Sequence, residues 1–166
     1  MWYWLAGSRG CYLVRSCYKL LTSTTFDSFA GVWRKLWNLN VPNKVKNFIW
    51  RAAINVLPTA VNLISKRVDI PSTCTVCNAY EEIVIHALIE CSFAKSCWIS
   101  SHVGFIGHCY FFLDWLDHIF TRCSKDECNV AIMLCWRLWI NRNDRVWNNK
   151  ICSTYQVLNS ARQLLY

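Results

Sequence analysis

The residues best suited to chemistry are three cysteines and one histidine that lie within eighteen consecutive positions. They follow the pattern C-x2-C-x8-H-x4-C and are Cys74, Cys77, His86 and Cys91. A CxxC pair lies on a tight turn that points both sulfur atoms at one position, and a histidine and a cysteine from a second element complete a tetrahedral Cys3His set. The pattern therefore predicts one zinc ion bound by these four side chains.

Zinc in such a set has a structural role, because protein fills all four tetrahedral positions and leaves none for the activation of water. Chance CxxC pairs are not rare in a chain with eleven cysteines. The alternative interpretation is a group of buried thiols with a hydrogen-bonded histidine. Four ligands in order within eighteen residues favour zinc over that alternative.

The remaining cysteines, histidines and acidic pairs give weaker signals. The pairs considered are Cys91 with Cys97, Cys123 with Cys128, His108 with Cys109, Asp114 with Asp117, and Glu81 with Glu82. The cysteines match no recurring ligand spacing and fall among apolar residues, which is typical of inert core thiols. We interpret the carboxylates as parts of a solvent-exposed face. Without a catalytic constellation, the sequence predicts a protein that is not an enzyme.

Composition narrows the class of protein further. Hydrophobic residues make up 54 % of the 166 positions, which predicts a folded chain of about one domain. Three prolines and five glycines leave no Gly-rich phosphate loop. We find neither a secretory signal nor an apolar stretch long enough to span a membrane, and the odd number of cysteines favours reduced thiols. We therefore expect an intracellular protein, nuclear or cytoplasmic.

Positive charge is concentrated in the first part of the chain. The net charge is +8, and residues 1–72 hold ten Lys and Arg against two Asp, which alone gives +8. This excess predicts binding to RNA or DNA, with a solvated charged face as the alternative. The candidate contact residues are Lys44, Lys46, Arg51, Arg34, Lys35 and Arg67. Trp33, Trp37 and Trp50 lie among them and could stack on bases, but the helical spacing of Trp33 and Trp37 favours core packing.

The elements that must position these residues are mostly helical. The predicted helices cover residues 26–39, a basic amphipathic stretch between Pro42 and Leu57, and residues 60–66, 93–101, 111–120 and 129–147. Thr59 and Ser92 are candidate N-caps for the third and fourth of these helices. We predict a mostly α fold with three parts: an extended N-terminal segment (1–24), a small helical domain with a Cys3His zinc-binding loop (25–101), and a helical extension (102–166).

Several of these residues together resemble a known family. They are Trp33-x3-Trp37, the run from Val41 to Arg51, Asn55-Val56-Leu57-Pro58-Thr59, Asn62-Leu63, Arg67, the four predicted zinc ligands, Glu81-Glu82, Ala87-Leu88, Ala94 and Trp98. The combination resembles the zinc-binding domain of plant non-LTR retroelement reverse transcriptases. The stretch Gly10-x-Tyr12-x-Val14-x-Ser16-x-Tyr18 resembles the opening segment of that domain. Trp136, Trp139 and Asn141-Arg142-Asn143 resemble the linker that usually follows it.

The resemblance implies a module that follows the polymerase and often precedes a ribonuclease H domain. It implies that the four predicted ligands bind zinc, and that the face formed by Lys44, Lys46 and Arg51 contacts template RNA or target DNA. The sequence contains no Tyr-x-Asp-Asp polymerase motif and lacks the carboxylates of a ribonuclease H domain. We therefore expect a fragment of an element that has no catalysis of its own.

Two alternatives stay open at this point. A Trp-rich surface could dock onto the polymerase or ribonuclease H domains of the parent element, and this predicts self-association with weak salt dependence. Nucleic-acid binding instead predicts an affinity that falls steeply with salt, because released counterions drive it. The third interpretation is a decayed retroelement fragment without present activity.

Overall fold

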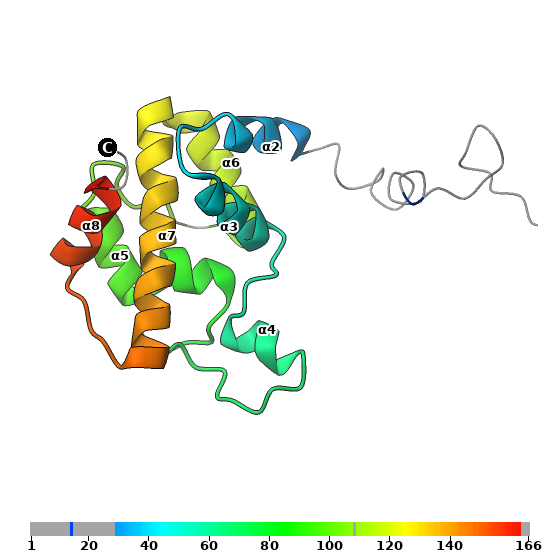
Figure 1. The fold of residues 1–166 in the computed structure, drawn as a ribbon, viewed down its shortest axis with the longest axis vertical. Coiled ribbons are helices and arrows are strands. Elements are labelled where there is room, and N and C mark those ends of the chain that lie inside the picture. The colour runs from blue at the N-terminus through cyan, green and yellow to red at the C-terminus, as the bar shows by residue number, and fades with distance from the viewer. Residues whose placement is uncertain (1–13, 15–28, 108, 164–166) are drawn as a thin grey trace, which may run out of the picture.

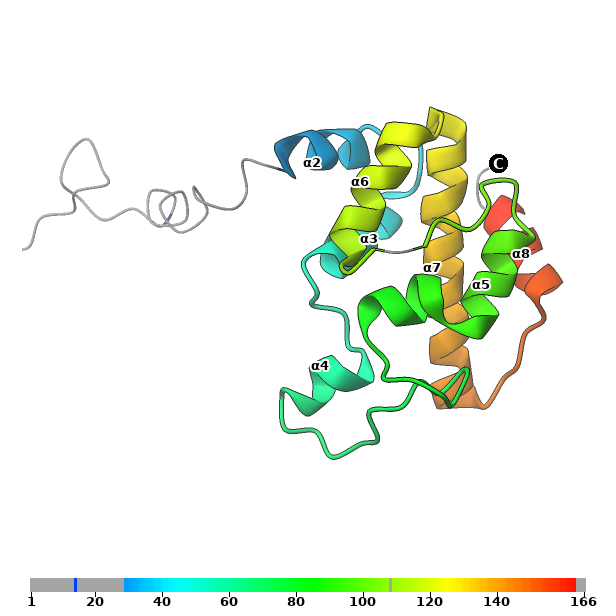
Figure 2. The same ribbon diagram turned by 180° about the vertical axis from the view of Figure 1, so that it is seen from behind.

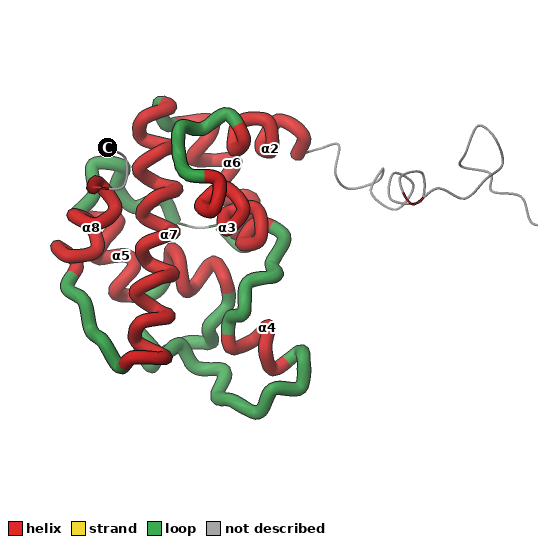
Figure 3. The backbone as a smooth tube through the Cα atoms, in the orientation of Figure 1, coloured by secondary structure: helices red, strands yellow, loops and turns green. Residues whose placement is uncertain are grey.

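The computed structural model describes residues 29–107 and 109–163 together with residue 14, and this part of the chain consists of helices and loops (Figures 1 and 3). The elements are α2 (Ala30–Trp37), α3 (Asn43–Ala53), α4 (Ala60–Ile64), the π-helical turn η2 (His86–Glu90), α5 (Ser92–Ile99), α6 (Phe112–Arg122), α7 (Lys125–Asn148) and α8 (Thr154–Gln163). No described residue belongs to a strand, and the predicted mostly α fold is confirmed. The extended segment predicted over residues 1–24 lies outside the described residues, apart from residue 14.

Helix α7 is the axis around which the other helices pack. It contacts α3, α6, α8 and η2, and Figures 1 and 2 show α5 and α8 on one side of it and α3 and α6 on the other. Five consecutive residues, from Ala131 to Cys135, are buried. Since five successive positions cannot share one face of a helix, neighbours cover α7 all round at this level.

The helices on both sides of residue 101 share one core. Leu36 of α2 and Ile49 of α3 belong to the same buried cluster as Leu116 of α6 and Ile132 of α7. Aromatic contacts join the same elements, because the ring of Phe48 meets that of Trp136 edge to face with the centroids 5.2 Å apart. The boundary predicted at residue 101, between the zinc-binding domain and the helical extension, stays a prediction. It falls between helices that pack together.

The ends of α3 and α4 follow local signals in the sequence. Pro42 directly precedes α3, and Asn55 beyond its end adopts a left-handed backbone conformation with a φ of 56°. The hydroxyl of Thr59 accepts a hydrogen bond from the backbone N–H of Asn62 at 3.4 Å, which confirms the predicted N-cap of α4. Helix α4 ends at Ile64, two residues earlier than predicted.

The starts of α5 and α7 also differ from the prediction. Ser92 is the first residue of α5 and not its N-cap, a position that Cys91 holds. Helix α7 begins at Lys125, four residues before the predicted start, because a capping box between Ser124 and Glu127 sets its start ahead of the apolar pattern.

Helix α8 was not assigned from the sequence. Its side chains Val157 and Ala161 are buried, and the helix contacts α5 and α7. A reciprocal pair of hydrogen bonds, between Ser153 and Gln156, lies at its start. This pair and the one before α7 both have the pattern S-x-x-[EQ], which is the signal that would have located the two helix starts.

None of the helices in the described residues is both long enough and apolar enough to cross a membrane.

The capping box of α7 allows a first test of the fold. Replacing Ser124 by alanine removes the acceptor for the backbone N–H of Glu127, which is expected to cost about 1 kcal/mol of stability. The melting temperature should fall by roughly 2–4 °C in a chain of this size. Ser100→Ala, at an exposed position beyond α5, is the control and should leave the melting temperature unchanged. Equal melting temperatures for the two variants would contradict a role of Ser124 as N-cap.

Candidate metal centre

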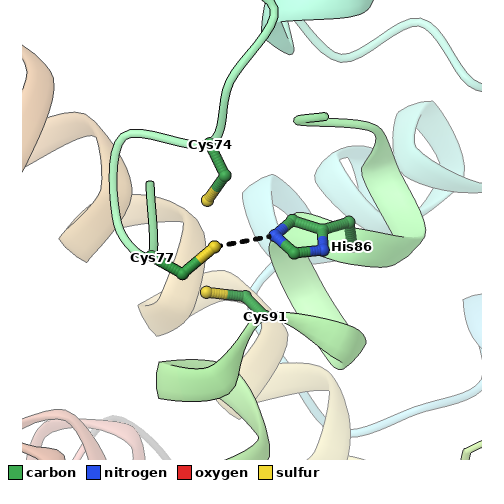
Figure 4. A group of neighbouring side chains, drawn as sticks. All are labelled: Cys74, Cys77, His86 and Cys91. Carbon is green, nitrogen blue, oxygen red and sulfur yellow. Dashed lines mark hydrogen bonds between the residues drawn. The ribbon is translucent and has the colours of Figure 1, made fainter. Parts of the chain in front are cut away.

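The structure brings the three predicted cysteines and the predicted histidine into one cluster (Figure 4). The ligand atoms of Cys74, Cys77, His86 and Cys91 all lie within 4.8 Å of one another. The Sγ atom of Cys77 is 3.3 Å from Nε2 of His86. Three of the four residues are buried and Cys77 is half-buried, so that the cluster is largely closed to solvent.

A tight turn positions the first two cysteines. The backbone N–H of Asn78 donates to the carbonyl of Cys74 at 2.8 Å, and Asn78 adopts a left-handed conformation with a φ of 56°. The N–H of Cys74 donates to the carbonyl of Tyr80 at 2.7 Å, next to the isolated bridge between Thr73 and Glu81. These backbone bonds close the loop and hold both sulfur atoms on its inner side (Figure 4).

A π-helical turn positions the other two ligands. His86 opens η2, and the N–H of Cys91 donates to the carbonyl of His86 at 2.8 Å, five residues apart. In a regular α-helix, two residues five positions apart point about 140° away from each other. The wider π turn brings His86 and Cys91 to the same side, as Figure 4 shows, and single π turns are frequent at functional sites.

Hydrogen bonds within the cluster shift the pKa values of its side chains. The hydrogen bond with Cys91, together with burial, raises the pKa of the Cys74 thiol to about 12, and the same bond lowers the pKa of Cys91. Burial alone would lower the pKa of His86, but its hydrogen bonds and charge interactions with Cys74 and Cys77 outweigh burial and raise it. The thiols and the imidazole therefore share hydrogen bonds whose protons a bound cation would displace.

The donor set and its spacing fit zinc. Zinc–sulfur bonds of about 2.3 Å in a tetrahedron place the ligand atoms about 3.8 Å apart. Ligand atoms that lie within 4.8 Å of one another can therefore reach this geometry through small side-chain movements. The described part of the chain contains no other group of three or more Cys, His, Asp or Glu side chains that could hold a metal ion. A metal held by all four side chains would have a closed, structural coordination shell.

One prediction about the neighbouring carboxylates is wrong. Glu81 is exposed as expected, but Glu82 is completely buried. Its carboxylate accepts hydrogen bonds from Nε of Arg142 at 3.2 and 3.0 Å, and a further one from the same guanidinium group through Nη2. It also accepts the backbone N–H of Ala60 at 3.0 Å. Burial of this carboxylate is offset by a buried positive charge sixty positions away in the sequence, which no local pattern reveals.

Glu82 and Arg142 connect the zinc loop to the rest of the fold. The N–H of Glu82 donates to the carbonyl of Ser72 at 2.8 Å, and its carbonyl accepts from Val61 of α4 at 3.4 Å. The guanidinium group of Arg142 lies 5.0 Å from the ring centre of Trp139, where a cation–π contact holds it. One ion pair thus joins the loop, the start of α4 and the central helix α7.

Four described cysteines outside the cluster, Cys97, Cys109, Cys128 and Cys135, are buried and behave as core residues. Burial raises the pKa of Cys97 and Cys128 to about 11 and that of Cys135 well above its usual value, so that these thiols stay protonated at neutral pH. Cys109 lies 3.6 Å from Nδ1 of His118, and burial is also the main cause that raises its pKa. His108, which the sequence pairs with Cys109, lies outside the described residues.

The six candidate contact cations differ in their surroundings. Arg34, Lys44, Arg51 and Arg67 are exposed. Lys46 is half-buried, and its ammonium group donates to the carbonyl of Trp37 at 2.9 Å. Lys35 is exposed, and its ammonium group donates to the carbonyl of Phe120 at 3.0 Å. Both lysines therefore stabilise the C-terminal ends of helices, where backbone carbonyls carry partial negative charge.

The tryptophans near these cations differ in their exposure to solvent. Trp33 and Trp50 are half-buried against the core, whereas Trp37 is 44 % exposed. The expected core packing of Trp33 and Trp37 is thus correct for the first residue and wrong for the second. Trp37 is the last residue of α2, where the helix end leaves its side chain open to solvent.

Comparison with known proteins agrees with this cluster. A family model described as zinc-binding in reverse transcriptase matches residues 12–98, a range that contains all four cluster residues. A protein from Arabidopsis thaliana that is named as a putative ribonuclease H protein is 26 % identical over 144 residues, which cover 82 % of this chain and 23 % of the relative. The chain therefore spans less than a quarter of the length of that relative. No solved structure matches the chain.

Zinc is the metal of the matched family, and the chain has a Cys3His group that could hold one such ion. The family model also covers more than half of the 166 residues. The chain belongs to the family of zinc-binding domains of reverse transcriptases.

Proposed function

We propose that this chain is a zinc-stabilised accessory module that binds nucleic acid and has no catalysis of its own. The ligands in this proposal are Cys74, Cys77, His86 and Cys91, and the single observation that supports it best is their convergence within 4.8 Å. Four protein ligands leave no open coordination position, so that the metal would hold the loop in shape and would not activate water. Binding then depends on side chains outside the metal centre.

The exposed cations of α3 are the best candidates for contact with phosphates. Lys44 and Arg51 are both exposed and lie seven residues apart, which is about two helical turns or 10 Å along one face. Neither side chain forms an ion pair with a described carboxylate. Free cations in such a row can each neutralise one phosphate and release its counterion.

The surface beside the metal cluster is less suited to this role. A shallow pocket there is lined by Tyr80, Glu81, His86, Glu90 and Lys95 together with Ile83. Two carboxylates against one ammonium group give this surface a negative balance that disfavours phosphate. This supports a scaffolding role for the loop and a contact role for α3.

The proposal is tested with the double variant Lys44→Glu/Arg51→Glu. We expect its affinity for single-stranded RNA or DNA to fall at least about tenfold at physiological salt, because two phosphate contacts are replaced by repulsion. The slope of log affinity against log salt concentration should decrease by about 2. Fluorescence anisotropy with a labelled oligonucleotide at several salt concentrations measures both quantities.

The matched control is Lys150→Glu/Arg162→Glu, which reverses one lysine and one arginine at exposed positions near α8. It should bind nearly as well as the unmodified chain. A loss of equal size in both double variants would show that only net charge matters and would contradict a role of the α3 face. No salt-dependent binding by the unmodified chain would contradict the proposal as a whole and favour docking onto other domains of the element.

A further inference from the structure

A hollow of about 330 Å³ lies where α2 meets the junction of α6 and α7. Its lining includes three cationic side chains, which are Arg34 and Lys35 of α2 and Lys125 at the start of α7. No carboxylate belongs to the lining. The two acidic residues in the first turn of α7, Asp126 and Glu127, line a different hollow. The positive charge of this hollow is therefore not compensated from within it.

The floor of the hollow is apolar. Among the lining residues, Leu39, Phe120 and Cys128 are buried and Cys123 is half-buried, whereas the three cations are exposed; Asn38 also lines the hollow. Burial is the main cause that raises the pKa of Cys128 to about 11, and burial also raises the pKa of Cys123. Both thiols are therefore neutral at pH 7 and add apolar surface, not negative charge, to the floor.

The elements around the hollow are held in place by described contacts. Lys35 donates to the carbonyl of Phe120 at 3.0 Å and joins α2 to the end of α6. Helix α6 packs against both α2 and α7, and these three helices lie side by side in Figures 1 and 2. The capping box at Ser124 fixes the start of α7 and with it the position of Lys125. The hollow is thus part of the packed structure.

An apolar floor with cations at its rim suits a ligand that has a flat apolar part and a phosphate group. The volume lies at the lower end of the range of small-ligand pockets. Bases in a duplex are stacked and paired, whereas an unpaired nucleotide can turn its base into a pocket while its phosphate stays outside. Cations at the rim can then contact that phosphate by charge-assisted hydrogen bonds.

Resting on the function proposed above, we propose that this hollow binds one unpaired nucleotide, with the phosphate at Arg34 and Lys125 and the base over the apolar floor. The same chemistry could come from a nucleotide within a single strand or from a free nucleotide. In either case the hollow adds a defined binding position to the more general attraction of the α3 face.

Two variants test separately how the charge of the hollow and its open volume contribute to binding. Arg34→Glu/Lys125→Glu reverses the two cations, and Cys123→Trp fills the space while leaving the charge unchanged. Each is expected to weaken the binding of a labelled single-stranded oligonucleotide about tenfold, and Cys123→Trp should do so with an unchanged salt slope. The matched controls are Lys150→Glu/Arg162→Glu and Cys152→Trp, the latter at another half-buried cysteine. Circular dichroism melting identifies any variant that fails to fold.

Competition with adenosine monophosphate identifies the source of the nucleotide. If adenosine monophosphate displaces the oligonucleotide from the unmodified chain, the hollow can bind a free nucleotide. If it does not, the hollow binds a nucleotide only as part of a strand. Either result supports the inference, provided that the two hollow variants bind the oligonucleotide weakly. Unchanged affinity in folded Arg34→Glu/Lys125→Glu and Cys123→Trp variants overturns the inference. That result leaves the proposed function in place if Lys44→Glu/Arg51→Glu still loses binding. No binding of oligonucleotide or nucleotide by the unmodified chain overturns both.

Discussion

Replacing Cys77 by serine is expected to remove the zinc ion and to unfold the loop that contains the cluster. A structural zinc ion contributes on the order of 10 kcal/mol to the folding of small zinc domains at neutral pH. Serine is a poor zinc ligand, and the hydrogen bond between Cys77 and His86 is lost with the sulfur atom. The zinc content should fall from one ion per chain to nearly none, and the melting temperature should fall sharply.

Zinc content is measured on protein purified without added metal and dialysed against a weak chelator. Cys152→Ser is the matched control, because Cys152 is also half-buried but lies outside the cluster. It should retain one zinc ion per chain and a nearly unchanged melting temperature. A Cys77→Ser variant that keeps its zinc and melts like Cys152→Ser would exclude Cys77 as a ligand and would sink the proposed metal centre.

The ligand types of this centre could be predicted from the sequence because their spacing is local. The CxxC turn, and a histidine and cysteine that return shortly afterwards, lie within eighteen positions, so that no knowledge of the tertiary fold is needed to group them. The π turn between His86 and Cys91 could not be predicted in the same way. A five-residue separation fits neither the α-helical nor the strand period, whereas the π turn places both side chains on one side.

Helix boundaries were predictable where a single residue sets them. Thr59 caps α4 through its own hydroxyl group, and Pro42 marks the start of α3, since both effects are local. The start of α7 was missed because its first residues are polar, and the apolar repeat begins only after the first turn. The capping-box pattern formed by Ser124 and Glu127 is the local signal that predicts the observed start of α7.

Charged residues with long-range partners were the least predictable. Lys35 and Lys46 look like free surface cations in the sequence, yet each stabilises the end of another helix. Glu82 looks like an exposed neighbour of Glu81, yet it is buried by a partner on α7. In each case the partner lies far along the chain or at a helix end, and the spacing of apolar residues does not predict where that helix ends. Hydropathy patterns predict which apolar residues are buried. Whether a charged residue is buried depends on a partner that only the tertiary fold supplies.

The ion pair between Glu82 and Arg142 gives the second large expected effect. Replacing Arg142 by methionine leaves the carboxylate of Glu82 buried without its charged partner, and only the N–H of Ala60 still donates to it. Breaking a buried pair in this way costs about 3–5 kcal/mol. In a chain of this size the melting temperature should fall by roughly 6–20 °C. Arg145→Met, at a half-buried position of the same helix, is the control and should have a much smaller effect.

The double variant Glu82→Leu/Arg142→Met separates the cost of an unpaired charge from the value of the pair itself. It removes both charges, so that the penalty for the buried carboxylate disappears, but the N–H of Ala60 loses its acceptor. An unsatisfied buried donor costs about 1–3 kcal/mol, and the double variant should therefore be more stable than Arg142→Met and less stable than the unmodified chain. Chemical unfolding of the unmodified chain, Glu82→Leu, Arg142→Met and the double variant gives the coupling energy. Coupling near zero, or a loss no larger than that of Arg145→Met, would show that the zinc loop is not joined to α7 through this pair.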